Sequence, residues 1–387
     1  MKNSRRAAAF IIVRWLMTKE FPSQMLPEDG PDRSFVQDLV YTTIRRFRPL
    51  GTVLRQLVRK WPKGELEALL YVGAAQILYM PSVPEFAAVN ETVEAAKEHQ
   101  NPNVAKVVNG VLRNLIRRRS ELEAMIASAP VEERESFPGV LYRRWVGRFG
   151  ETGAEKLAKW HNEPAETYLA YPDRFEKLER GRKVSSVEGF DEGAFIVQDP
   201  GTRLAVELTD AKAGESVLDA CAAPGGKTIQ LAWRGAKVTA CEVNPRRRRR
   251  LAENLERSKL ARSVEVIGSL PEGGVLFDKV LVDAPCSNTG VLRRRPDARW
   301  NWSEEKLAQL VKLQSEILDA AASCVSPGGR LVYSTCSNEP EENQRQVEAF
   351  LARKPQFKLV EMRESLPHES GFDGAFAAAL ELTGVDR

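Results

Sequence analysis

The most constraining feature of this sequence is an alternation of short apolar segments with helical segments that begins near residue 211. The apolar segments are SVLDACA, AKVTACEVN, SVEVIGS, DKVLVDAP and GRLVYSTCS, and helices are expected from Gly226, from Pro245 and from Ser303 to about Ser323. Strands that are apolar on both faces must be covered by helices on both sides, so the alternation predicts an α/β fold with a parallel, doubly wound sheet. Such sheets bind ligands at the carboxyl ends of their strands, so the residues that follow the strands are the candidates for chemistry.

The N-terminal part has a different pattern. Residues 4–119 place apolar side chains at helical spacing, with Pro and Gly between the segments, and predict an all-α bundle of six or seven helices. The region that follows mixes a helical linker with short strand candidates, TYLAYP, KVSSVEG and AFIVQD. We therefore expect an all-α domain at 1–120, a helical linker with a small α+β element at 121–210, and an α/β catalytic domain at 211–387.

Charge is spread unevenly along the chain. The net charge is +4, and residues 1–119 carry 19 Lys and Arg against 11 Asp and Glu, a surplus of 8 that leaves −4 for the remainder. A basic N-terminal unit indicates a polyanionic partner. A solvated helical surface explains the charge equally well.

The start of the chain contains basic and apolar residues, as a signal peptide does, but Arg14 interrupts the apolar stretch and no small-residue cleavage site follows. No apolar run reaches the ~20 residues that span a bilayer. We therefore expect a cytoplasmic protein that does not enter the membrane.

The five cysteines all lie in the C-terminal half. Their odd number argues against a disulfide framework, and the absence of C-x-x-C or of a His/Cys cluster argues against zinc. We expect free thiols, no bound metal and a monomer.

A glycine-rich turn follows the first strand of the α/β region. Strand SVLDA leads into this turn and then into a helix; its residues are Cys221, Ala222, Ala223, Pro224, Gly225, Gly226 and Lys227. The glycines let the backbone approach a ligand, and the helix N-terminus offers free N–H donors. The pattern matches neither of the common phosphate-binding motifs. The second strand ends at Glu242, where an acid can bind ribose hydroxyls, so turn and acid together predict a nucleoside ligand.

Three motifs carry a resemblance to a known family. D-A-C-A-A-P-G-G-K-T, D-A-P-C-S-N-T-G and S-T-C-S-N-E-P-E-E-N resemble those of the RNA cytosine-5 methyltransferases. The resemblance implies a Rossmann-like domain that binds S-adenosylmethionine through Cys221 to Lys227, Glu242 and Asp283. Where Ser269 stands, the family usually has an Asp that holds the adenine edge. A serine carries no charge, so we expect weaker cofactor affinity or a substitute neighbour.

The chemistry that the family performs requires a nucleophile. C5 of cytosine cannot attack a methyl sulfonium until a thiolate adds to C6, which is covalent catalysis. Cys286 and Cys336 each follow a strand, and position alone leaves them equivalent. DNA cytosine methyltransferases use the Pro-Cys cysteine, whereas the RNA family uses the Thr-Cys cysteine. The resemblance thus implies that Cys336 attacks and that Cys286 assists product release.

The resemblance also suggests two supporting roles. Asp283 is placed at the amidine edge of the cytosine, and Lys227 balances charge nearby. Cys241 and Cys324 are expected to be small buried side chains, and Cys221 partly so.

RNA contacts are expected in the loop after Cys286. Basic residues next to an aromatic that could stack on a base are typical of RNA binding, and the RRxPDxxW pattern resembles the family's loop. The candidates are Arg293, Arg294, Arg295, Arg299 and Trp300. For the run Arg246–Arg250, RNA contact and a solvated helix explain the sequence equally well.

The N-terminal part carries its own resemblance. VNETVEAAK and KVVNGVLRNL resemble the NusB-type RNA-binding domain that precedes bacterial 16S rRNA methyltransferases of the RsmB (Fmu/Sun) type. The resemblance implies 16S rRNA as the substrate. The alternatives are a tRNA cytosine-5 methyltransferase and a NusB-like RNA-binding adaptor without activity; a DNA methyltransferase fits the T-C-S-N motif less well.

Overall fold

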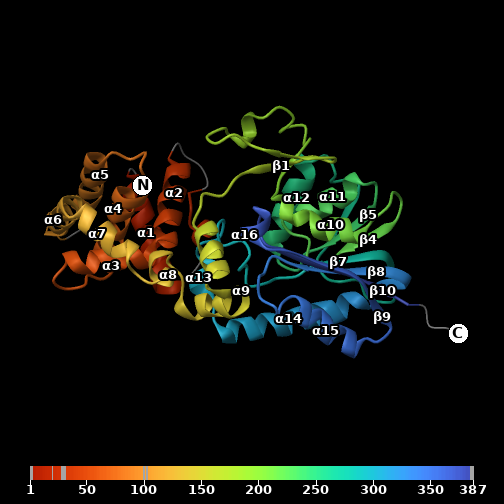
Figure 1. The fold of residues 1–387 in the computed structure, drawn as a ribbon. Coiled ribbons are helices and arrows are strands. Elements are labelled where there is room, and N and C mark those ends of the chain that lie inside the picture. The colour runs from red at the N-terminus through yellow and green to blue at the C-terminus, as the bar shows by residue number, and fades with distance from the viewer. Residues whose placement is uncertain (1–2, 20, 28–31, 99–100, 102, 384–387) are drawn as a thin grey trace. The chain divides into compact units, whose positions relative to one another are not determined.

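The structure is a computed structural model that describes residues 3–19, 21–27, 32–98, 101 and 103–383. The chain forms two compact units (Figure 1). The first, the helical unit, contains residues 1–163 and 295–301, and the second, the catalytic unit, contains residues 164–294 and 302–387. The three-part division at 120 and 210 stays a prediction.

Helices alone make up the regular structure described in the helical unit, which confirms the prediction for residues 4–119. Its α-helices are α1 (Ser4–Thr18), α2 (Arg33–Arg45), α3 (Phe47–Leu57), α4 (Glu65–Tyr79), α5 (Glu85–Lys97), α6 (Asn103–Arg117), α7 (Arg119–Ala127), α8 (Val131–Arg134), α9 (Gly139–Trp160) and α13 (Ala298–Asn301). Helix α4 is the centre of the bundle, because residues 68–77 are all buried, whichever side of the helix they occupy. A helix that is apolar all round belongs inside a core.

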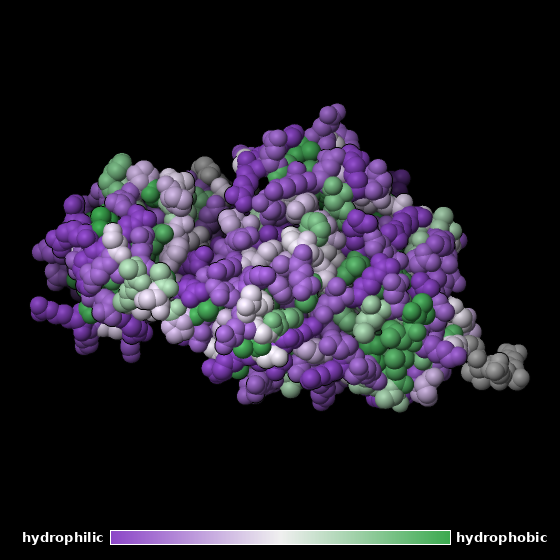
Figure 2. All heavy atoms as spheres, in the orientation of Figure 1, coloured by the Kyte–Doolittle hydropathy of each residue, from purple (hydrophilic) through white to green (hydrophobic). Residues whose placement is uncertain are grey.

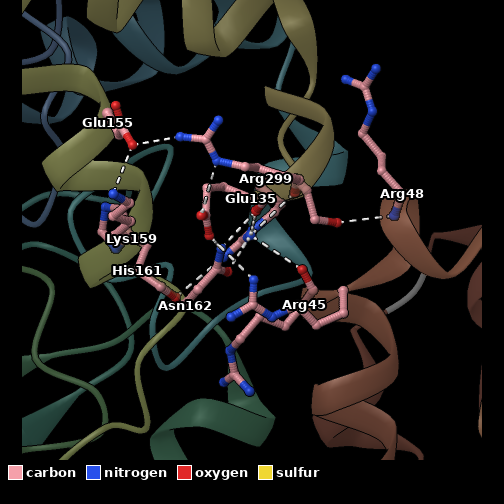
Figure 3. A network of polar contacts seen from close by, with 11 residues as sticks. Arg45, Arg48, Glu135, Glu155, Lys159, His161, Asn162 and Arg299 are labelled. Carbon is pink, nitrogen blue, oxygen red and sulfur yellow. Dashed lines mark hydrogen bonds and ion pairs between the residues drawn. The ribbon is translucent and has the colours of Figure 1, made fainter. Parts of the chain in front are cut away.

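Residues 295–301 reach the helical unit from far along the chain. Arg299 is fully buried, and its guanidinium donates to the carbonyl of Ser136 at 3.2 Å, to Oδ1 of Asn162 at 3.0 Å and to the carbonyl of His161 at 3.3 Å (Figure 3). It also lies over the ring of Phe137, 4.0 Å from the centroid. The Arg299 guanidinium therefore donates hydrogen bonds to carbonyl groups that would otherwise be buried without a donor.

The catalytic unit begins with a small antiparallel sheet. Its strands are β1 (Tyr168–Ala170), β2 (Phe175–Lys177) and β3 (Ile196–Val197), in the order β2-β1-β3. The strand expected at KVSSVEG is wrong, because residues 184–186 form a turn of 3-10 helix. Val184 and Val187, three residues apart, both pack against the cluster around Phe195, and a 3-10 turn puts residues at that spacing on one face.

A seven-stranded sheet forms the body of the catalytic unit. Its strands are β4 (Ser216–Asp219), β5 (Lys237–Cys241), β6 (Val264–Ile267), β7 (Phe277–Asp283), β8 (Val325–Thr335), β9 (Phe357–Ser365) and β10 (Ala375–Leu382), in the order β6-β5-β4-β7-β8-β10-β9. The first five in this order are parallel, as predicted. Strand β10 runs antiparallel to both of its neighbours, β8 and β9, so the sheet is mixed, and β9 points the same way as the first five strands.

Two hydrophobic cores cover the two faces of this sheet. Alternate residues of each strand point to opposite faces, and accordingly Leu281 packs in one core and Val280 in the other. Helices α10 (Arg203–Thr209), α11 (Gly226–Trp233) and α12 (Pro245–Arg257) contribute to the first core. Helices α14 (Glu304–Ala322) and α15 (Gln344–Arg353) contribute to the second. The doubly wound prediction is confirmed, and the strand order reverses between β4 and β7.

The outer strand β9 is largely exposed. It exposes the side chains of Leu359, Val360 and Met362. Figure 2 shows hydrophobic residues gathered on part of the surface of the catalytic unit. Among the described residues, no helix combines the length and the apolar character needed to cross a bilayer.

Replacing Arg299 by Met is expected to lower the free energy of unfolding by about 3 kcal/mol, because several buried oxygens lose their donor at once. Chemical denaturation followed by tryptophan fluorescence measures the change, since Trp15 and Trp300 both pack in the hydrophobic core of the helical unit. Arg249→Met is the matched control; that side chain is 83% exposed, and its loss should change stability by under ~0.5 kcal/mol. Equal stability of the two variants would contradict a structural role for Arg299.

Candidate active site at the carboxyl ends of the strands

The turn between β4 and α11 is shaped by glycine. Gly225 has φ of +108°, and a Cβ there would lie 2.8 Å from Cδ1 of Leu251. Only glycine adopts this conformation without strain. Helix α11 begins at the next residue, Gly226, so its first N–H groups face the space beyond the turn. The sequence predicts a nucleoside ligand at this turn.

Helix α12 holds the turn in place. Arg247 Nη2 donates to the carbonyl of Ala223 and Asn254 Nδ2 to that of Pro224, both at 2.8 Å. Arg248 Nη1 donates to the carbonyl of Glu242 at 2.9 Å. Two members of the arginine run Arg246–Arg250 are therefore part of the framework around the turn, a role that the sequence alone did not indicate.

An acid follows β5 beside this turn. Glu242 is 3% exposed, its Oε1 accepts the N–H of Asn244 at 2.9 Å, and its Oε2 lies 3.4 Å from Nε of Arg247. Ser269 lies after β6 and is exposed. The neighbouring Gly268 closely approaches Arg248, whose Nη1 would lie 2.5 Å from an added Cβ. A turn that offers N–H groups, followed by a carboxylate on the next strand, fits the hydroxyl-bearing sugar of a nucleoside.

Lys227 and Asp283 form an ion pair across the strand-order reversal. Nζ of Lys227 lies 2.6 Å from Oδ2 of Asp283, and the lysine side chain is 14% exposed. Burial alone would lower the pKa of Lys227, but the Asp283 carboxylate outweighs burial, so the pKa ends above its ordinary value. Lys227 is thus a cation at neutral pH.

Asp219, at the end of β4, is a second acid behind the turn. It is 1% exposed, and its Oδ2 accepts the hydroxyl of Thr228 at 2.7 Å. Burial raises the pKa of Asp219 to about 6, with a contribution from the nearby charge of Asp283. The sequence analysis assigned no role to this residue, because an Asp at a strand end does not by itself indicate complete burial.

The two cysteines singled out from the sequence face each other. Sγ of Cys286 and Sγ of Cys336 are 3.3 Å apart, and Sγ of Cys336 lies 3.5 Å from Oδ1 of Asn288. The sulfur of Cys336 and burial together raise the pKa of Cys286 well above its ordinary value, so Cys286 keeps its proton. The ammonium of Lys227 interacts electrostatically with Cys336. The structure therefore brings together Cys286, Cys336, Lys227 and Asp283.

The loops that carry the cysteines are joined directly. Gly290 donates its N–H to the carbonyl of Cys336 at 3.0 Å, and Asn338 donates its N–H to Oγ1 of Thr289 at 2.9 Å. A Cβ on Gly290 would lie 2.7 Å from the carbonyl oxygen of Cys336, so this approach requires glycine. These hydrogen bonds fix the loop after β7 and the loop after β8 to each other.

A buried carboxylate that the sequence analysis missed contacts both of these loops. Glu342 is fully buried and accepts hydrogen bonds from Ser287 and from Ser337, the residues that follow the two cysteines. The motif S-T-C-S-N-E-P-E-E-N contains this residue, but it holds three glutamates. Two of the three, Glu339 and Glu342, are buried, and their sequence spacing does not reveal this.

The five predicted RNA-contacting residues lie in different surroundings, and RNA contact by the partly exposed ones stays a prediction. Arg293 is 4% exposed, and Arg294 is paired with Asp199 and Asp373 inside the catalytic unit. Arg299 and Trp300 are packed in the helical unit, where Nε1 of Trp300 donates to the carbonyl of Ile44 at 3.0 Å.

Arg295, the fifth predicted contact, is partly exposed. Its guanidinium lies over the ring of Phe21, 5.0 Å from the centroid. The loop looked like an RNA-binding segment because buried and exposed arginines are indistinguishable in sequence. Its cations are held by the protein's own carboxylates, carbonyls and rings.

The strand order, the glycine-rich turn after β4 and the acid after β5 together define a Rossmann-like methyltransferase. The family model described as 16S rRNA methyltransferase RsmB/F matches residues 206–381, and that described as NusB family matches residues 2–117. The "Ribosomal RNA small subunit methyltransferase B" of Yersinia enterocolitica is 34% identical over 98% of this chain and 98% of its own length.

The protein of the same name from Vibrio cholerae is 35% identical over 90% of this chain and 89% of its own length. The crystal structure of PH0851 shares the fold, with a TM-score of 0.78 and 24% identity, over 98% of this chain and 99% of that chain. The chain belongs to the 16S rRNA methyltransferase RsmB/F family. It is an RNA methyltransferase with a NusB domain, and S-adenosylmethionine is its methyl donor.

Asp219→Asn is expected to stabilise the protein at high pH. Because the pKa of about 6 in the folded chain lies above the ordinary 3.8, the folded chain binds this proton more tightly than the unfolded chain. Stability therefore falls as the pH rises from about 4 to about 6, and the loss of up to about 3 kcal/mol persists above that range. The variant should lack this loss.

Urea denaturation between pH 4 and pH 8 measures the effect. The stability of the Asp219→Asn variant should exceed that of the wild type at pH 8 and match it near pH 4. Asp191→Asn, at an exposed position, is the control and should follow the wild type throughout. A constant difference across the range would contradict the titration of Asp219.

Proposed function

We propose that this enzyme methylates C5 of a cytosine in 16S rRNA through a covalent bond between Cys336 and C6. The observation that carries the proposal is the 3.3 Å separation of Sγ of Cys286 and Sγ of Cys336, beside the ion pair of Lys227 and Asp283. Two thiols and a buried cation at the carboxyl ends of adjacent strands are the groups that cytosine C5 chemistry requires.

We infer the cofactor pocket from the turn and the acids around it. Cys221, Ala222, Ala223, Pro224, Gly225, Gly226 and Lys227 would surround S-adenosylmethionine, with Glu242 toward the ribose and Ser269 and Asp283 toward the adenosine and the methionyl part. When bound, this donor supplies an electrophilic methyl group. Because Ser269 is exposed and uncharged, it contributes at most a single hydrogen bond to the adenine edge.

In the first step, the thiolate of Cys336 forms a bond to C6 of the base. The electron pair of the C5–C6 double bond shifts to C4–C5 and that of C4–N3 moves onto N3, so C5 becomes the nucleophilic carbon of an enamine. Asp283 would lie at the amidine edge, where N3 and N4 carry the developing charge. The ammonium of Lys227 balances the site, since it remains charged beside both Asp283 and Cys336.

In the second step, the adduct breaks after C5 has received the methyl group. The C5 proton passes to a base, its electron pair restores the C5–C6 double bond, and the S–C6 pair returns to Cys336. The thiol of Cys286, 3.3 Å away, donates to the departing sulfur. Such a donor stabilises the thiolate as it leaves.

The electrostatic surroundings support this assignment of the two cysteines. The cation Lys227 interacts electrostatically with Cys336. The carboxylate of Glu342 acts on Cys286 and adds to the rise of its pKa, which favours the neutral thiol. The attacking sulfur is thus the one beside the cation, and the proton-bearing sulfur is the one beside the anion.

Substitution of each cysteine separates the two roles. Cys336→Ala should abolish methylation, because no nucleophile remains to activate C5. Cys286→Ala should form the adduct but release it slowly, so that a protein–RNA complex persists on denaturing gels. Cys324→Ala is the control, since Cys324 is buried away from the site in the second core. Adduct accumulation by the Cys336 variant would instead exchange the two roles.

The RNA substrate is testable in cells and in solution. Relatives named for the small ribosomal subunit support 16S rRNA. Bisulfite sequencing of rRNA from a strain that lacks this protein should show the loss of one 5-methylcytosine in 16S rRNA. Purified enzyme should methylate 16S rRNA transcripts and leave tRNA transcripts unmodified; the reverse result would assign the enzyme to tRNA.

A further inference from the structure

The carboxylate of Glu342 contacts both cysteine loops at once. Its Oε1 accepts the N–H of Ser287 at 2.9 Å, and its Oε2 accepts the hydroxyls of Ser287 and Ser337. Ser287 follows Cys286 directly, and Ser337 follows Cys336 directly. One side chain therefore fixes the residue next to each sulfur.

Gln314 of α14 extends this arrangement to the other side of Cys286. Its Nε2 donates to Oε1 of Glu342 and to the carbonyl of Pro285, both at 2.9 Å. Cys286 is thus held on both sides, through Pro285 by Gln314 and through Ser287 by Glu342. The main chain of Glu342 is fixed as well, because its carbonyl accepts the hydroxyl of Tyr333 at 2.7 Å.

Burying the carboxylate of Glu342 costs free energy of folding, and this cost indicates a role other than stability. Glu342 is fully buried, and the hydrogen bonds to its carboxylate within the described part of the chain come from neutral donors of Ser287, Ser337 and Gln314. Burial raises the pKa of Glu342. A carboxylate buried without a cation is retained at a cost in stability, so a role in holding the site explains it better than a contribution to folding.

We propose that Glu342 is a positioning residue that holds the sulfurs of Cys286 and Cys336 at contact distance. The thiol of Cys286 can then donate to the sulfur of Cys336 as that sulfur leaves C6 of the base. The geometric part of the proposal concerns the protein alone. The part about catalysis rests on the proposed function.

The distance between the sulfurs can be tested without RNA or cofactor. Diamide removes two hydrogens from a pair of thiols that lie in contact and leaves a disulfide. The wild-type enzyme should form the Cys286–Cys336 disulfide rapidly, as measured by mass spectrometry of the linked peptides. Glu342→Ala should slow this reaction at least ~10-fold, because the two loops lose their common anchor.

Two further variants make the result interpretable. Glu342→Gln keeps the volume and one carbonyl acceptor, so it should fold even if the Ala variant does not, and it should slow the disulfide by a smaller factor. Glu341→Gln is the matched control, because Glu341 precedes Glu342 in the chain and pairs with Arg345 at the surface. Its rate should equal that of the wild type. Cross-linking at the wild-type rate in a folded Glu342 variant would overturn the proposal.

The catalytic part has a separate readout. Glu342→Gln should lower kcat for methylation about 10- to 100-fold and leave the KM for S-adenosylmethionine within about twofold, since the group acts on the cysteines and not on the cofactor turn. An unchanged kcat in the Glu342→Gln variant would overturn the proposed catalytic role of Glu342. Because cross-linking needs no substrate, it would still report on the geometry if the enzyme proved to methylate a position other than C5.

Discussion

The parallel pairing of β7 with β8 is the constraint on which the rest of the site depends. Asp283, the last residue of β7, lies opposite Ser334 near the end of β8, so the chain leaves both strands at the same level of the sheet. The loops that follow carry Cys286 and Cys336. In this register, two residues that are 50 positions apart in sequence have their sulfurs 3.3 Å apart. A shift of one residue would turn every side chain of the strand to the other face.

Two buried charged side chains, Lys227 and Glu342, act on different cysteines of the site. Lys227 lies on the side of the cofactor turn and acts on Cys336, whereas Glu342 lies beneath the loops and acts on Cys286. Each charge is desolvated, so its effect on a nearby thiol is stronger than it would be in water. Two cysteines that are equivalent by their position in the fold therefore have different charged neighbours. This difference agrees with the roles that the family resemblance implies.

Much of the fold could be predicted from the sequence, because apolar strands and amphipathic helices have distinct periods. The same pattern placed Cys286 and Cys336 after strands, and the structure brings them together with Asp283 and Lys227. The antiparallel direction of β10 was not predictable, since apolar alternation does not specify the direction of a strand.

The errors have a common physical cause. Arg299 looked like an RNA contact in a basic loop, but it is buried against Ser136 and His161, which lie more than a hundred residues earlier in the chain. Glu342 went unnoticed for the complementary reason, because surface and buried carboxylates have the same letter. In both cases tertiary contacts decide the role of a charged side chain, and local sequence does not report them.

The central claim is that Cys336 forms the covalent bond to the base while Cys286 assists its release. RNA that carries 5-fluorocytidine tests it most directly, because fluorine at C5 cannot leave as a proton and the adduct therefore persists. Wild-type enzyme would be incubated with this RNA and S-adenosylmethionine, digested with protease and nuclease, and analysed by tandem mass spectrometry. The account predicts a methylated fluorocytidine on the peptide that contains Cys336. The same nucleotide on the Cys286 peptide, or the absence of any adduct, would contradict it.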